Sequence, residues 1–176
     1  MMTKDQIQEL INNSIKGNTN SFTDLVVEFQ PLVFRLAFRL LCNNEDAKDV
    51  VQDVFIKVWT NLQRYDNQYS FSTWLYKIAG NLCCDRLRSK KRVREIDLPV
   101  YPVESVESAM INKELKELII NFTSDLTPKQ KLVFMLRDIE ELDTEEIMAI
   151  TGLTAEKIKS NLYLARKRIK EKLNDI

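Results

Sequence analysis

Two adjacent cysteines followed by a basic run, NLCCDRLRSKKRVR at residues 81–94, are the part of the chain best equipped for chemistry. Neighbouring residues of a helix point about 100° apart, so Cys83 and Cys84 are poorly placed to share one small metal ion. Zinc sites usually space their cysteines by two to four residues and need four ligands. The chain offers only one further cysteine, Cys42, and no histidine. We therefore expect no metal and no other cofactor.

The thiols have a simpler interpretation. A disulfide is disfavoured in the reducing cytoplasm. At least one cysteine of the pair is expected to pack as a small buried hydrophobe, beside a partly exposed thiol whose pKa Arg86 and Arg88 lower. Without histidine the chain lacks the commonest general base, and it shows no nucleophile–base pair or phosphate loop. We expect a protein that is not an enzyme.

Charge is balanced overall but segregated along the chain. The net charge of +0, from 26 basic and 26 acidic residues, taken alone argues against a nucleic-acid binder. However, residues 86–94 and 157–170 are basic without any acid, and residues 138–146 are acidic without any base. Blocks of opposite sign predict separate contact surfaces.

The elements that position these blocks are expected to be helices, because apolar residues recur every three or four positions and only 3 glycines are present. We predict an all-α protein of two small helical domains joined by a flexible linker. The predicted domains span 1–94 and 109–176, and the linker spans the proline-containing, acidic residues 95–108. No apolar run reaches the roughly 18 residues of a membrane span, and the N-terminus has no signal-peptide pattern. The expected location is the cytoplasm, without membrane insertion.

Within the first domain, helices are predicted over 3–16, about 20–42, 45–62 and about 72–90. Pro31 should kink or divide the second of these, and Asn44 should cap the third. The 45–62 helix has one apolar stripe and an acidic opposite face. That face is either solvated or a docking surface for a protein, and periodicity alone favours the former.

The second domain ends in a predicted helix-turn-helix. Asp143 or Thr144 caps a short helix, Gly152 makes the turn, and Thr154 caps a longer helix. The N-terminal part of such a second helix meets base edges, and later basic residues suit phosphates. A helical hairpin with a solvated basic face is the alternative.

Aromatic and basic residues alternate over 65–86, a pattern that suits stacking on unpaired bases and phosphate neutralisation. Aromatics at helical spacing also serve as core, and we expect this at least in part for Phe71, Trp74, Leu75 and Ile78.

Two longer motifs, taken together, resemble a known family. NNEDAKDVVQDVFIKVWTNLQRY and the following FSTWLYKIAGNLCCDRLRSKKR closely resemble region 2 of bacterial extracytoplasmic-function (ECF) sigma factors. The stretch from Leu126 to Leu173 resembles their region 4. The two blocks stand in the family's order and cover most of the chain, about 20–95 and 110–173.

The resemblance implies a function for each surface. The helix matching 45–62 would dock on the clamp helices of the β′ subunit of core RNA polymerase, and region 4 is also expected to contact the β flap. The residues implied in the clamp contact are Asp46, Asp49, Gln52, Asp53 and Lys57.

The segment matching 63–88 would open promoter DNA at the −10 element and hold a flipped base in its loop. The residues implied there are Tyr65, Asn67, Tyr69, Phe71, Ser72, Trp74, Lys77, Asn81, Arg86 and Arg88. Region 4 would read the −35 element as duplex, through Glu156, Lys157, Lys159, Ser160, Tyr163, Arg166 and Lys167.

Two positions depart from the family pattern: Gly80 stands where a basic residue is common, and Asn161 replaces an arginine. Many members are held inactive by an anti-sigma factor, so a partner covering both domains is implied as well. The rival interpretation is an ordinary helix-turn-helix regulator whose N-terminal domain binds something other than polymerase.

Overall fold

The structure, a computed structural model, describes residues 2–94 and 122–174, with side chains throughout except for 90–94. Every regular element in these ranges is helical, as predicted. The N-terminal helices are α1 Lys4–Ile15, α2 Thr19–Leu41, α3 Asn44–Asn61, the short η1 Leu62–Arg64, and α4 Phe71–Arg94. The C-terminal helices are α6 Pro128–Phe134, the π-helical turn η2 Met135–Ile139, α7 Thr144–Thr151 and α8 Ala155–Asn174. The predicted linker, 95–108, lies outside the described residues.

The helix starts are set by side-chain caps. Asn43, rather than the predicted Asn44, caps α3, and its side-chain oxygen accepts from the backbone N–H of Asp46 at 3.0 Å. The chain therefore turns into α3 one residue earlier than the sequence pattern suggested. Pro31 lies inside α2 without dividing it, because buried Phe29 and Val33 on either side hold both halves on one core.

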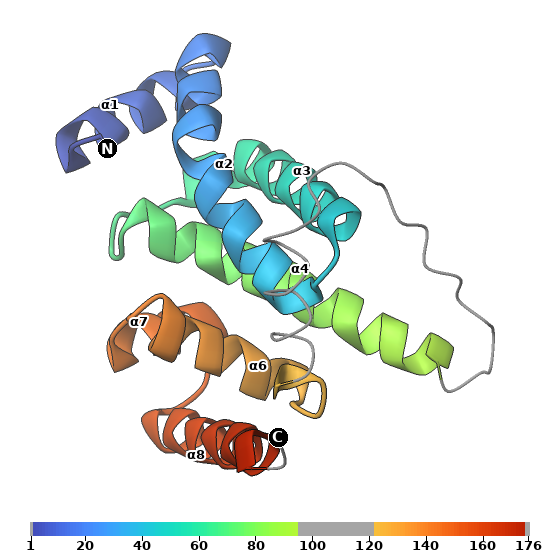
Figure 1. Cartoon of the computed structure of the whole chain (residues 1–176). Coiled ribbons are helices and arrows are strands. Elements are labelled where there is room, and N and C mark those ends of the chain that lie inside the picture. The colour runs from blue at the N-terminus through green and yellow to red at the C-terminus, as the bar shows by residue number, and fades with distance from the viewer. Residues whose placement is uncertain (1, 95–121, 175–176) are drawn as a thin grey trace.

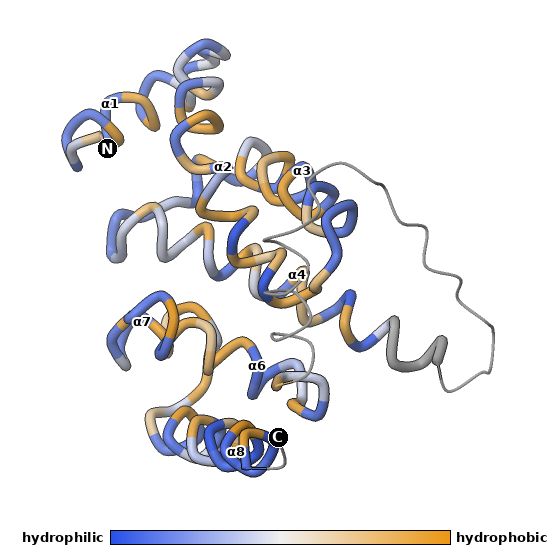
Figure 2. Tube along the Cα trace, viewed as in Figure 1, coloured by the Kyte–Doolittle hydropathy of each residue, from blue (hydrophilic) through white to orange (hydrophobic). Residues whose placement is uncertain are grey.

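α2 is the central helix of the N-terminal bundle, packed against α1, α3 and α4 (Figure 1). Its apolar face repeats in steps of three and four, and the same spacing on α3 supplies the facing side of the core. The fully buried members include Leu25, Val33, Leu36 and Leu40 of α2, Val50, Val54 and Val58 of α3, and Leu75 and Ala79 of α4. Burying a side chain of this size contributes about 1.5–3 kcal/mol. Figure 2 shows the apolar faces of these helices turned toward one another.

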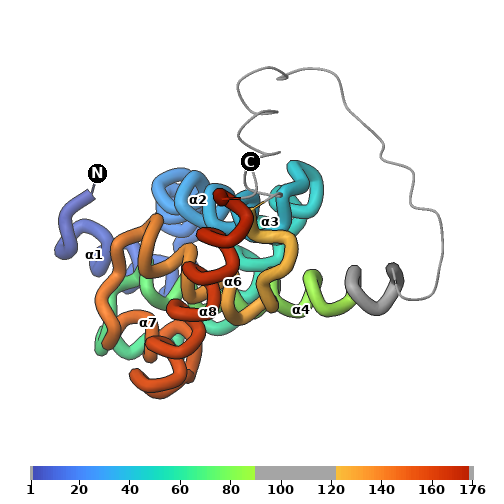
Figure 3. Tube along the Cα trace, turned by 60° about the horizontal axis from the view of Figure 1, so that its bottom comes forward, coloured from blue at the N-terminus to red at the C-terminus, as the bar shows by residue number. Residues whose placement is uncertain are grey.

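The C-terminal helices pack directly on the N-terminal bundle. α6 and α7 lie along α4, while α8 lies on the far side of α6, away from α4 (Figures 1 and 3). Leu132, Leu136 and Ile147 belong to the same continuous cluster of buried side chains as the core of the first bundle.

Gly80 of α4 lies close against Leu132 of α6. A Cβ placed at Gly80 would stand 3.1 Å from both terminal methyl carbons of Leu132. A side chain at position 80 would therefore require Leu132 to move, which gives the departure from the family pattern a local reason. None of the helices in the described ranges is long and apolar enough to cross a membrane.

Candidate nucleic-acid interface

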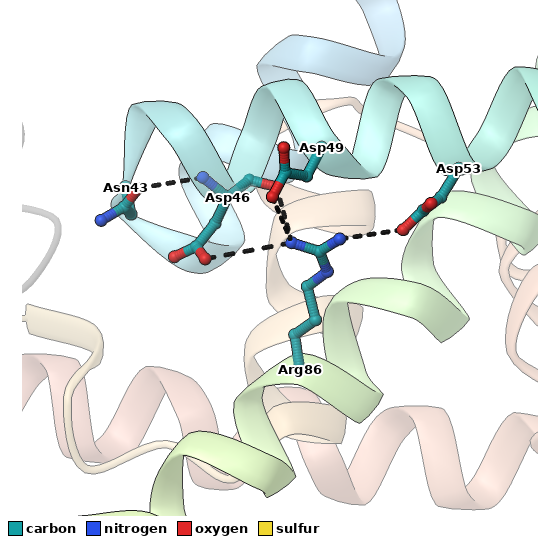
Figure 4. A network of polar contacts seen from close by, with 5 residues as sticks. All are labelled: Asn43, Asp46, Asp49, Asp53 and Arg86. Carbon is teal, nitrogen blue, oxygen red and sulfur yellow. Dashed lines mark hydrogen bonds and ion pairs between the residues drawn. The ribbon is translucent and has the colours of Figure 1, made fainter.

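Three acidic residues of α3 converge on one arginine of α4 (Figure 4). Asp46, Asp49 and Asp53 are three and four positions apart and therefore share one face of the helix. The guanidinium of Arg86 lies 2.8 Å from the Asp53 carboxylate, 3.5 Å from that of Asp49 and 3.9 Å from that of Asp46. Arg86 also donates to the backbone carbonyl of Asp46 at 3.4 Å.

This network joins two predicted surfaces. Arg86 was predicted to contact DNA and the three acids to contact a protein partner, yet the structure pairs them with each other. The hydrogen bonds to Asp53 and Asp49 hold the pKa of Arg86 above its ordinary value despite partial burial. In this arrangement Arg86 fixes α3 to α4, so the helix that carries the acidic face and the helix that carries the basic run are positioned together.

The rest of the acidic face of α3 remains open. Gln52 and Lys57 are exposed. Ile56, which sequence reasoning passed over, lies on the same face four positions after Gln52 and is 62% exposed. Its signal was available in the sequence, because Ile56 falls outside the apolar stripe of its own helix. Single exposed apolar residues are common on protein surfaces, so Ile56 matters here because it lies among the polar residues of the face that was predicted to bind a protein.

The aromatic residues of the predicted −10 loop pack mainly on one another. The Tyr65 ring lies 5.4 Å from those of both Phe71 and Trp74, and its hydroxyl donates to the Tyr69 carbonyl at 2.9 Å. Burial raises the pKa of Tyr65. Phe71 is 3% exposed and also contacts Phe29, so it serves as core.

The tip of this loop is accessible. Asn67 adopts a left-handed backbone with φ 58°, and Tyr69 keeps 39% of its surface exposed. Ser72 is half-buried and its hydroxyl is 2.8 Å from that of Ser70. An exposed aromatic beside polar residues is what stacking on an unpaired base requires.

Beyond the loop, α4 carries a solvent-facing polar row. Lys77, Asn81 and Arg88 are all exposed, and their spacing of four and seven places them on one side of the helix. Arg88 is paired with Asp85 at 2.7 Å, a contact within one turn.

The helix-turn-helix forms as predicted. Asp143 caps α7 reciprocally with Glu146, Gly152 takes a left-handed φ of 67°, and the Thr154 hydroxyl accepts from the Lys157 N–H at 3.4 Å. The buried face of α8 contains Ile158 and Ala165.

All seven predicted −35 residues are exposed: Glu156, Lys157, Lys159, Ser160, Tyr163, Arg166 and Lys167. Tyr163 is the most exposed of the large apolar side chains that the structure describes, at 65%. Arg166 is paired with Asp138 of η2, with Nε 3.0 Å from the carboxylate, and Lys167 is 3.9 Å from Glu171. In the described part of the chain, the residues of the first two turns that would meet a DNA groove are exposed.

The acidic block 138–146 faces inward at two points. Glu140 accepts from the Tyr76 hydroxyl at 2.6 Å and pairs with Arg39 of α2. Glu146 accepts from the Thr73 hydroxyl at 3.2 Å. Burial and the hydrogen bond to Glu140 raise the pKa of Tyr76. This block thus joins the C-terminal helices to α2 and α4, a use that its charge alone did not reveal.

The cysteines occupy the same junction. Cys83 and Cys84 are 0% and 2% exposed, and burial raises the pKa of both, that of Cys83 to about 12. The prediction of a small buried hydrophobe is confirmed, and the expectation of a partly exposed, acidified neighbour is wrong, because α6 covers both thiols. Among the described residues, no group of three or more potential ligands could hold a metal ion.

Comparison with known proteins assigns both halves of the chain. A family model described as Sigma-70 region 2 matches residues 25–93, and one described as Sigma-70, region 4 matches residues 116–169.

Full-length relatives agree. The chain is 30% identical over 189 residues to the ECF RNA polymerase sigma factor SigW of Bacillus subtilis (strain 168), covering 100% of this chain and 99% of that one. It is 29% identical over 182 residues to the ECF RNA polymerase sigma-E factor of Escherichia coli (strain K12), covering 96% and 95%.

Two solved structures share the fold. One is CnrH in complex with the cytosolic domain of CnrY, with a TM-score of 0.71, 22% identity and coverage of 97% and 98%. The other is the sigma factor RpoE in complex with the anti-sigma factor NepR from Bartonella quintana, with a TM-score of 0.68, 21% identity and coverage of 87% and 96%.

Proposed function

The chain belongs to the ECF sigma factors of RNA polymerase, and we propose that it directs core RNA polymerase to promoters and helps to melt them. The observation that carries this proposal is the order of region 2 and region 4 on one chain, matched from end to end by full-length relatives. A sigma factor performs no covalent chemistry of its own, and it acts where polymerase acts, in the bacterial cytoplasm.

The proposed polymerase surface is the outer face of α3. Gln52, Lys57 and Ile56 supply an exposed polar rim and an apolar centre. Asp49 and Asp53 lie beside them, tied to Arg86. Apolar anchors within a polar rim carry most of the binding energy in protein interfaces. The β′ clamp helices are the proposed partner, and region 4 would contact the β flap.

The proposed −10 surface joins the tip of the 65–72 loop to the exposed row of α4. Tyr69 and Asn67 would contact an extruded base, and Lys77 and Arg88 would hold phosphates. Unstacking a base costs a few kcal/mol, which these contacts must offset. The proposed −35 surface is the first two turns of α8, and Arg166 and Lys167 further along the helix would contact the phosphate backbone of the DNA.

Engaging both elements requires the packed regions to separate. Positions −35 and −10 are about 25 base pairs apart, or about 85 Å of duplex. A compact chain of this length has a radius of gyration of about 16 Å and is roughly 40 Å across. We therefore infer that α6 and α7 leave α4 when the protein binds a promoter with polymerase. The similar sigma factor RpoE was solved in complex with an anti-sigma factor. By analogy, we propose that an anti-sigma factor binds this chain and stabilises the packed form.

In vitro transcription with core polymerase and a genomic template library tests the proposal, and transcripts dependent on this protein are the expected result. The discriminating variant is Ile56→Lys, which alters the α3 face without touching the Arg86 network. Val27→Lys is its matched control, because Val27 is equally exposed, at 61%, on another helix.

Ile56→Lys should lose polymerase binding while Val27→Lys keeps it. Retention of polymerase binding by Ile56→Lys would exclude this face as the docking site. If no polymerase binding were found for the wild-type protein, the helix-turn-helix regulator with another partner would replace the sigma factor.

A further inference from the structure

Lys131 of α6 is buried between the two regions with a sulfur atom as its partner. The residue is 7% exposed, and its Nζ donates to the Sγ of Cys42 at 3.6 Å. Lysines are almost never fully buried unless they are paired, and a carboxylate is the partner that neutralises their charge. Within the described ranges, no ion pair between a carboxylate and Lys131 is found. The packing of the C-terminal helices on the N-terminal bundle has thus placed an amine against the thiol at the end of α2.

Cys42 is the accessible cysteine of the three. It ends α2 in a left-handed conformation with φ 53° and remains partly exposed. Cys83 and Cys84 are buried, and burial holds their pKa values above the ordinary range, so few of their thiols ionise near neutral pH. The thiolate is the form of cysteine that peroxide oxidises, and Lys131 is the donor placed against the Cys42 sulfur.

We propose that Cys42 and Lys131 are a modification site at which a peroxide oxidant links region 2 to region 4 covalently. In the first step the Cys42 thiol and hydrogen peroxide give a sulfenic acid and water: sulfur loses two electrons and the O–O bond takes them. In the second step the lone pair of Nζ attacks Sγ, the S–O bond breaks, and the hydroxyl leaves with an amine proton as water. The product is an S–N bond, of the sulfenamide type that sulfenic acids form with nitrogen.

The environment of Lys131 favours the second step. A lysine must be neutral to act as a nucleophile, and burial lowers the pKa of Lys131, with the Cys42 and Cys83 sulfurs opposing that shift. The side chain is also held at the sulfur by packing, which removes most of the entropy cost of bringing the two groups together. An excess of small thiol would reverse the reaction by attack on the sulfur.

The bond would join α2 to α6 and hold the packed arrangement. Only this consequence rests on the proposed function, because a linked protein could not separate its two regions to span −10 and −35. The chemistry itself is independent of it.

The experiment treats the full-length, reduced protein with a small excess of hydrogen peroxide, followed by intact mass measurement and tryptic peptide mapping without reductant. We expect the mass to fall by about 2 Da, a linked peptide containing Cys42 and Lys131, and recovery on adding dithiothreitol. Lys131→Arg and Cys42→Ser should lack the linked peptide, whereas Lys129→Arg, on the same helix, should retain it.

A gain of about 16 Da confined to Cys42, or a disulfide from Cys42 to Cys83 or Cys84, would overturn the proposal. The wild-type peptide map decides this even where a variant fails to fold. Transcription by the linked protein should be lost and restored by dithiothreitol. Linked protein that transcribes normally would refute the consequence, while reduced protein that never transcribes would refute the proposed function instead.

Discussion

Arg86 is predicted to be a structural tie between α3 and α4 as well as a candidate DNA contact, and a double-mutant cycle with Asp53 measures the tie. The Arg86–Asp53 contact is short, at 2.8 Å, but the side chains are 27% and 45% exposed. Exposed pairs contribute about 0.2–1 kcal/mol, and hydrogen bonds to charged groups about 1.5–3 kcal/mol. A partly exposed pair of this geometry should therefore couple by about 1 kcal/mol.

The single variant Arg86→Ala should cost more than this coupling. It also removes the contact to Asp49 and the hydrogen bond to the Asp46 carbonyl. It also leaves the carboxylates of Asp49 and Asp53, four residues apart, to repel each other by a few tenths of a kcal/mol. We expect a total loss of about 2 kcal/mol, by summing these contributions. In urea this moves the unfolding midpoint by about 1 M for a slope near 2 kcal/mol/M.

The cycle consists of the wild type, Arg86→Ala, Asp53→Asn and the double variant, all unfolded in urea at low salt. Arg88→Ala is the control, because its pair with Asp85 is a local, exposed contact and should cost under about 0.5 kcal/mol. A coupling below about 0.3 kcal/mol would refute the tie, being within the range found for independent sites. Normal stability of Arg86→Ala combined with defective promoter melting would make Arg86 a DNA contact alone.

Two further variants and one labelling experiment test other parts of the structure. Gly80→Val should force α6 away from α4, since even a Cβ there meets a side chain at 3.1 Å; we expect a loss of about 1–3 kcal/mol by thermal unfolding, and an unchanged midpoint would show that the two regions do not depend on this contact. At pH 8 a thiol reagent should label Cys42 first, because a pKa of about 12 leaves about one Cys83 thiol in 10⁴ ionised; equal labelling rates in native protein would contradict the burial. Asp138→Asn should free Arg166 and steepen the salt dependence of duplex binding by about 0.9 in log–log slope; a parallel salt titration would indicate that Arg166 contacts no phosphate.

The regular parts of the fold were predictable because each is decided locally. The three-and-four spacing of apolar residues fixes α3 and α4, and Asp143, Gly152 and Thr154 fix the helix-turn-helix through caps and a left-handed turn that few other residues make. The single-residue error at the start of α3 arose because Asn43 and Asn44 are equally good caps in isolation. Only the packing of the first turn chooses between them.

The relations between distant residues were not predictable in the same way. The basic run predicts that Arg86 is charged, but it does not predict the contact with Asp53, 33 positions earlier. Likewise, nothing in the acidic block predicts the hydrogen bond from Tyr76 to Glu140 or the ion pair of Glu140 with Arg39. These contacts follow from how α6 and α7 lie on α4, which is a long-range arrangement without a local signal. The glycine at 80 was the one available hint, since it departs from the pattern where α6 approaches.

The pairing of opposite charges gives a physical reason for the balanced composition. Proteins bind nonspecific DNA largely by releasing counterions as basic residues neutralise phosphates. A cation already neutralised by a carboxylate of its own chain releases few counterions, and Arg86, Arg88 and Arg166 are each paired in this way. Each of these arginines must exchange its carboxylate for a phosphate, so the net gain in binding free energy on random duplex DNA is small. Sustained binding then requires contacts that only polymerase and a matching promoter supply. The segregated charges thereby suit a protein that must not be sequestered on the chromosome while its regions are packed together.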